Sequence, residues 1–219
     1  AGYTTCAIGM SLVLGFALPD NFRYPYAAIG FSDFWRRWHI SLSTWLRDYL
    51  YVPLGGNRNG AARTYVNLML TMLLGGLWHG AAWTFVVWGG LHGSYLAAER
   101  WLKPRLGHLD VWRTWLGRIA LAALTYFLVN LTWVFFRAQD FATAERMIRS
   151  MLLIERSGAP VLTHWFLLST SVAIAALLIA HWRMRDAMLH DAVSRWPAAL
   201  VGLTWGAMLF LIAITQGGG

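Results

Sequence analysis

Long apolar stretches dominate the chain, and short polar segments separate them. The stretches that predict membrane-spanning helices are Tyr3–Leu18, Tyr65–Ala98, Ile119–Phe136, His164–Ala180 and Pro197–Thr215. A bilayer core of about 30 Å takes about 20 helical residues. Because the first stretch is slightly short of that length, we expect its start to be missing. We therefore interpret the chain as a piece of a longer protein.

Tyr65–Ala98 is too long for one straight span. At about 1.5 Å per residue it would form a helix of roughly 50 Å. We expect a break near Gly75–Gly76 or at Gly80, which would leave His79 near a helix end. Glu99–Arg118, with a proline and a glycine, is predicted to be a basic loop.

Ser32–Tyr51 has the period of an amphipathic helix. Its large apolar residues recur at spacings of three and four, on one helical face: Phe34, Trp38, Leu42, Trp45 and Tyr49. Ser32 is a candidate N-cap, and Asp33 is placed to pair with Arg37 one turn on. This pattern predicts a single helix lying in the membrane interface. Residues Arg137–Arg156 are predicted to form a second amphipathic surface helix. Residues Arg183–Arg195 are predicted to form a charged loop.

Composition supports a membrane protein. Hydrophobic residues make up 58% and charged residues 13% of the 219 residues, against about 45–50% and 25% in soluble domains. The net charge of +8 sits in short loops, which favours lipid headgroups over nucleic acid as its partner. A single cysteine excludes an intrachain disulfide and a cysteine zinc cluster. The predicted fold is an all-α multi-pass membrane protein with additional interfacial or re-entrant helices.

His79 is the leading candidate for chemistry. It lies in LLGGLWHGAAW, within an apolar run where an ionisable side chain is costly and marks a functional site by default. A neutral imidazole can take a proton from a hydroxyl and return it later. The alternative is a buried histidine that only joins two helices by hydrogen bonds. Trp78, beside it, is a candidate substrate-binding residue.

His39 is the second candidate. In a continuous helix it shares a face with Trp35 and Ser43, so it could act as an acid or base or hold a substrate carbonyl or phosphate. Its alternative role is contact with lipid headgroups. Ser43 and Cys6 lack the adjacent base of an activated nucleophile. Trp38 and Ser43 are retained as candidates for substrate or donor binding.

His92 follows His79 by a spacing that turns the two in nearly opposite directions on one continuous helix. A shared metal site is not expected, and no metal is predicted. We assign His92 mainly to interhelical hydrogen bonding, and substrate binding is its alternative role.

Several arginines surround His39 in the sequence and could receive phosphates, because guanidinium groups match them bidentately. They are Arg36, Arg37, Arg47, Arg58 and Arg63. Lipid headgroups and the phosphates of a donor such as coenzyme A are both open as ligands, and Arg36, Arg37 and Arg47 are the donor-binding candidates.

Three segments resemble the C-terminal half of the membrane-bound O-acyltransferases (MBOAT), in particular the bacterial branch that O-acetylates alginate and other polysaccharides. They read DFWRRWHISLSTWLRDYLYVPLGGNR, TMLLGGLWHGAAWTFVVWGGLHG and WVFFRAQDFATA. The resemblance implies that His79 corresponds to the active-site histidine and His39 to a second functional histidine. It also implies that residues 1–219 are the C-terminal portion of a single domain whose N-terminal helices are missing.

The resemblance further implies an acyltransferase of the bacterial inner membrane, with acetyl-CoA as donor substrate and no bound cofactor. Extracytoplasmic acetyltransferase partners and a polysaccharide acceptor would complete the transfer. Two other functions stay open: a transporter in which histidines relay protons, and a scaffold that holds soluble acetyltransferases at the membrane. The absence of acidic residues from the predicted spans weakens the transporter alternative.

Overall fold

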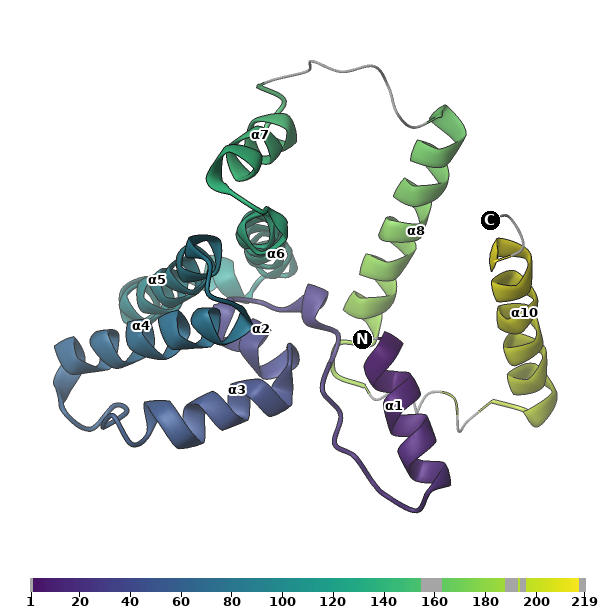
Figure 1. Ribbon diagram of the computed structural model, residues 1–219, viewed down its shortest axis with the longest axis horizontal. Coiled ribbons are helices and arrows are strands. Elements are labelled where there is room, and N and C mark those ends of the chain that lie inside the picture. The colour runs from purple at the N-terminus through teal and green to yellow at the C-terminus, as the bar shows by residue number, and fades with distance from the viewer. Residues whose placement is uncertain (1, 155–162, 188–192, 194–195, 217–219) are drawn as a thin grey trace.

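The computed structural model describes residues 2–154, 163–187, 193 and 196–216, and every regular element within them is helical. The α-helices, in chain order, are α1 Gly2–Val13, α2 Phe31–Arg37, α3 Ile40–Leu46, α4 Gly60–His79, α5 Trp83–Leu106, α6 Trp115–Arg137, α7 Phe141–Met151, α8 His164–Arg183 and α10 Ala198–Gln216 (Figure 1). Shorter turns are the 3-10 helices η1 Pro25–Ala27 and η3 Asp110–Arg113 and the π-helix η2 Arg47–Tyr51. The all-helical prediction is confirmed for the described residues.

Among the residues that the structure describes, two helices are long and apolar enough to cross a bilayer. They are α6 and α8, with mean hydropathies of 1.9 and 1.7, and they match the predicted spans Ile119–Phe136 and His164–Ala180. In α10 the apolar part is shorter, Ala198–Phe210. No residue in the hydrophobic window of α8 is buried, so its side chains need an apolar surrounding that the described chain does not supply.

Two of the predicted segments have different bounds in the structure. The first apolar stretch is helical only to Val13. The amphipathic helix α7 is shorter than Arg137–Arg156, because Asp140 caps it by accepting a hydrogen bond from the backbone N–H of Thr143 at 2.7 Å. Residues 155–156, and most of the predicted loop Arg183–Arg195, lie outside the described residues.

The predicted break after His79 is confirmed. Helix α4 ends at His79, and α5 begins at Trp83 after a three-residue turn, so the two helices lie side by side as a hairpin (Figure 1). Glycines permit the close approach. A Cβ added to Gly76 would lie 2.3 Å from the carbonyl oxygen of Phe85, and one added to Gly89 would lie 2.3 Å from that of Met72. Neither position has room for a side chain.

The predicted loop from Glu99 is wrong, because α5 continues to Leu106. Glu99 instead reaches across to α2 and accepts hydrogen bonds from the backbone N–H groups of Phe31 and Ser32, the latter at 2.9 Å. A carboxylate there satisfies the unpaired N–H groups at a helix start and their partial positive charge. The N-cap position belongs to Gly30, so the predicted capping role of Ser32 is also wrong.

The predicted single helix from Ser32 to Tyr51 is wrong as well. It breaks at Trp38, which is extended, and at His39, which has a left-handed backbone with φ of 45°. Asn21 explains the break. Its carbonyl oxygen accepts from the backbone N–H of Ile40 at 2.9 Å, and its side chain accepts from that of Ser41 at 3.0 Å. These bonds cap a new helix, α3, so a tertiary contact overrides the helical period.

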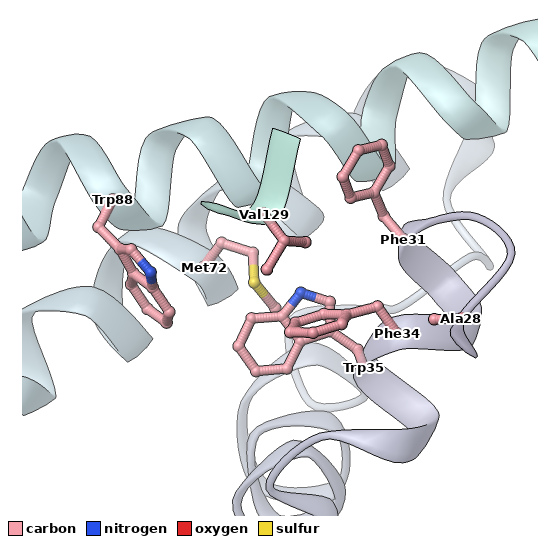
Figure 2. Packing of buried hydrophobic residues seen from close by; sticks show 7 residues of the cluster. All are labelled: Ala28, Phe31, Phe34, Trp35, Met72, Trp88 and Val129. Carbon is pink, nitrogen blue, oxygen red and sulfur yellow. The ribbon is translucent and has the colours of Figure 1, made fainter. Parts of the chain in front are cut away.

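The main hydrophobic cluster joins α2 to the hairpin and to α6. Figure 2 shows its buried members converging from these elements: Ala28, Phe31, Phe34, Trp35, Met72, Trp88 and Val129. Because α2 packs into this cluster, it holds the break at His39 in a fixed place beside the hairpin.

Candidate active site

His79 occupies the turn of the α4–α5 hairpin. It is the last residue of α4, and Gly80 follows it as the C-cap. A Cβ on Gly80 would lie 2.7 Å from the Phe85 ring, so a side chain there would displace that ring. The glycine therefore lets α5 fold back directly against the histidine.

Aromatic rings surround the His79 imidazole on several sides. Phe136 of α6 lies edge-on with its ring centroid 5.0 Å away, Trp88 of α5 lies edge-on at 5.3 Å, and Phe85 lies at 6.2 Å. The side chain is half-buried, so one part of it stays accessible. An imidazole in such surroundings is accessible to a hydroxyl while the apolar walls limit water.

His39 lies at the break between α2 and α3 and is also half-buried. Its buried Nδ1 has no hydrogen-bond partner on another residue in the described part of the chain. Burial lowers the pKa of His39 below its ordinary value, and a contact with its own backbone offsets this only in part. At neutral pH His39 is therefore uncharged, with a ring nitrogen available to a ligand.

The structure brings His39 and His79 within electrostatic range of each other, so a charge on His39 opposes protonation of His79. Their sequence separation gives no indication of this proximity. Two imidazoles coupled in this way resist being charged together.

His92 lies fully buried in the interior, at 0% exposure. Its Nε2 is 3.0 Å from the Thr132 hydroxyl, which itself bonds the Val129 carbonyl oxygen at 2.7 Å. This is the interhelical hydrogen bond expected of His92, between α5 and α6. Because Nε2 is engaged and the ring is buried among the described residues, the structure supports the interhelical role, and substrate contact by His92 stays a prediction.

Trp88 connects the two histidines of the hairpin, and the sequence analysis missed it. Its ring lies 5.3 Å from His79 and 4.7 Å from His92. The expectation that these histidines face opposite ways holds for a continuous helix, but the break folds α5 back so that both meet one indole. Among the described residues no group of three His, Cys, Asp or Glu side chains gathers as a metal site would.

The other aromatic and hydroxyl candidates have structural partners. The Trp38 ring packs against Phe22 at 4.9 Å and Trp133 at 5.2 Å. The Ser43 hydroxyl donates to the Trp38 carbonyl oxygen at 3.0 Å, so it holds the break together. Trp78 is 63% exposed and lies beside His79, at 4.9 Å between ring centroids. Substrate contact by any of them stays a prediction.

The arginines predicted to form one belt have different surroundings. Arg37 pairs with Asp33 at 2.8 Å, and Arg47 pairs with its neighbour Asp48 at 2.7 Å. Arg36 and Arg37 line a common cavity, and Arg47 lies outside its lining. Donor binding by Arg36, Arg37 and Arg47 stays a prediction.

Comparison with known proteins shows a match to one protein family. The model of the membrane-bound O-acyltransferase family, MBOAT, matches residues 1–109, which include both candidate histidines. The chain is 43% identical over 202 residues to a probable alginate O-acetylase AlgI of Pseudomonas fluorescens, covering 90% of this chain and 38% of that protein.

Two further relatives carry other names. A peptidoglycan O-acetyltransferase of Helicobacter pylori is 44% identical over 69% of this chain and 28% of its own length. A teichoic acid D-alanyltransferase of Bacillus subtilis is 34% identical over 47% of this chain and 29% of its own length. The chain thus spans well under half the length of these relatives.

Proposed function

The chain belongs to the membrane-bound O-acyltransferase family, and from this premise we propose that it forms part of a membrane-embedded O-acetyltransferase. The enzyme moves an acetyl group from a thioester donor, acetyl-CoA, towards hydroxyl groups of an exported polysaccharide such as alginate, and partner proteins complete the transfer. The names of the alginate and peptidoglycan relatives support this substrate class.

The observation that carries the proposal is the histidine pair at the two helix breaks. His79 is half-buried among aromatic rings at the end of α4, and His39, with its unpartnered Nδ1, lies within electrostatic range. Neither imidazole is tied to a carboxylate in the described structure, so both are free to exchange a proton.

His79 acts as the general base in this mechanism. It takes the proton of the acceptor hydroxyl as that oxygen attacks the thioester carbonyl carbon. The new C–O bond forms, the C–S bond breaks, and the leaving thiolate receives the proton from the imidazolium. His39 donates a hydrogen bond to the carbonyl oxygen as negative charge develops on it. The aromatic walls protect the thioester from water.

The chain spans the inner membrane of a bacterium several times in this proposal, as the C-terminal portion of one MBOAT domain. The apolar helices α6 and α8 and the family support this placement. Extracytoplasmic acetyltransferase proteins act as partners that complete transfer to the polysaccharide.

The test is acetyl transfer to polysaccharide by the full-length protein carrying His79→Ala or His39→Ala. Loss of a general base costs about 10²–10⁴-fold in rate, and we expect a fall in that range for His79→Ala. His108→Ala is the matched control, because His108 is exposed in the turn after α5. Full activity in both histidine variants would refute the pair and favour a scaffold that holds soluble acetyltransferases.

A further inference from the structure

A cavity of about 430 Å³ lies between the carboxyl end of α2 and the segment that follows α8. Its lining residues come from three segments far apart in sequence: Arg23, Asp33, Arg36, Arg37, Arg185, Asp186 and Ala187. Four arginines and two aspartates give a net charge of +2 (4 − 2). The cavity is therefore suited to an anion.

Both carboxylate oxygens of Asp33 already have partners in the cavity wall. Its Oδ1 pairs with Arg37 at 2.8 Å, and its Oδ2 pairs with Arg185 at 2.7 Å and accepts from the backbone N–H of Ile29 at 2.9 Å. Arg37 also donates to the Arg185 carbonyl oxygen at 2.7 Å. Because these side chains are only 12–16% exposed, they form a fixed frame.

The remaining carboxylate is a weak competitor for an anion. Asp186 is 76% exposed at the rim and lies 3.4 Å from Arg37 and 3.6 Å from Arg185. At such exposure its ion pairs are weakened by water. A ligand that enters the cavity therefore meets a carboxylate that is already partly neutralised and solvated.

Arg23 and Arg36 supply the cationic groups that the frame leaves unused. Neither guanidinium makes an ion pair or side-chain hydrogen bond with any residue that the structure describes. The backbone N–H of Arg23 donates to the Arg37 carbonyl oxygen at 2.8 Å, which fixes Arg23 beside α2. Each guanidinium presents a planar fork of N–H donors that matches phosphate oxygens bidentately.

We propose that this cavity is a binding site for a phosphate ester group, held by Arg23 and Arg36 against the Arg37–Asp33–Arg185 frame. The ester belongs either to a phospholipid headgroup or to a soluble phosphorylated molecule, since both present the same oxygens. A lipid in this site goes beyond the proposed acetyl transfer, whereas a coenzyme A donor in it would rest on the proposed function. It also differs from the predicted belt, because Arg47, Arg58 and Arg63 lie outside the lining and Arg23 and Arg185 join it.

The test measures binding to the full-length protein after delipidation in detergent. One arm titrates inorganic pyrophosphate by calorimetry. The other adds phosphatidylglycerol, with diacylglycerol as its phosphate-free counterpart, and counts retained lipids by native mass spectrometry. The variant is Arg23→Gln with Arg36→Gln, which leaves the Asp33 frame intact. Its matched control is Arg113→Gln with Arg118→Gln, which removes the same charge from two exposed positions outside the cavity.

We expect the cavity variant to bind pyrophosphate about tenfold or more weakly, because charge-assisted hydrogen bonds are lost. If the control variant binds it as tightly as the unaltered protein does, the result supports a soluble ligand. If the unaltered protein retains phosphatidylglycerol in preference to diacylglycerol and only the cavity variant loses this preference, the result supports a lipid ligand. The proposal is overturned if the unaltered protein binds neither probe, or if both double variants lose binding equally. The readout is binding, so it stands independently of any acetyl-transfer result.

Discussion

Trp88 lies edge-on against His79, with ring centroids 5.3 Å apart and ring planes at 87°. The same indole contacts the buried His92, and it is itself only 4% exposed. One side chain therefore forms a wall of the candidate active site and part of the core that supports it.

Replacing this indole should reduce both stability and activity. Trp88→Ala leaves a cavity between the two histidines, and we expect a loss of about 3–5 kcal/mol in the free energy of unfolding, together with reduced acetyl transfer. Trp88→Phe keeps an aromatic wall and should lose less of both. Thermal unfolding in detergent and a transfer assay measure the two effects. Trp78→Ala is the control, since Trp78 is 63% exposed; equal stability losses at both tryptophans would contradict the prediction.

The acidic limb of the rate profile should report protonation of the base His79 together with that of His39. Burial lowers the pKa of His39 from its ordinary value of about 6.5, so its imidazole becomes charged only below that value. Its charge then opposes protonation of His79, and activity should fall only as the pH drops below the ordinary histidine range. His39→Gln, which cannot titrate, should alter the shape of this limb in kcat/KM. A wild-type limb centred above pH 7 would argue against a neutral, desolvated His39.

Asp33→Asn should destabilise the link between α2 and the segment after α8. The substitution leaves Arg37 and Arg185 without their shared carboxylate. We expect a loss of about 2 kcal/mol, below the roughly 3–5 kcal/mol of a fully buried pair, because some solvent reaches these groups. Urea unfolding of the variant and of Arg185→Gln, with the double variant, measures the coupling. If the losses in unfolding free energy of the two single variants simply add in the double variant, the interaction between Asp33 and Arg185 contributes no stability of its own.

The same pair gives a stability that depends on pH. Burial by itself would raise the pKa of Asp33, but the Ile29 N–H bond and the two arginines outweigh it and hold the pKa below its usual value. The stabilisation is therefore complete above the unfolded value of about 3.9 and is lost as the pH falls through the lower folded pKa. The stability difference between wild type and Asp33→Asn should shrink only at those acidic pH values.

Two neighbouring glycines of α5 should respond oppositely to alanine. A Cβ at Gly89 meets the Met72 carbonyl oxygen at 2.3 Å, whereas one at Gly90 meets only the Leu73 side chain at 3.6 Å. Gly89→Ala should therefore push the hairpin apart and cost about 1–3 kcal/mol. Gly90→Ala should be neutral or stabilise by up to about 1 kcal/mol. Comparison of the two melting temperatures tests whether α4 and α5 touch as closely as described.

The order of the apolar helices could be predicted from the sequence. Run length and hydropathy predicted α6 and α8. The excessive length of Tyr65–Ala98 and its glycines predicted a break near Gly75–Gly76 or at Gly80, and the structure has it at Gly80. His79 could be found in the same way, because an ionisable residue within an apolar run is costly wherever the run folds.

The break at His39, the capping of α2 by Glu99 and the meeting of Trp88 with two histidines could not be predicted in that way. Each depends on a contact between segments distant in the sequence: Asn21 with Ile40, Glu99 with Phe31, and the fold-back of α5 onto α4. Hydrophobic periodicity describes the neighbours of a residue along one helix and carries no information about such partners.

The sequence by itself therefore determined which segments are apolar helices and which residues are candidates for the chemistry, since both follow from local composition and spacing. Only the tertiary structure decided which side chains come together, including Trp88 with His79 and the four arginines around one cavity. Hydrogen bonds and ring contacts between distant segments have a free energy large enough to end a helix that its local pattern would continue.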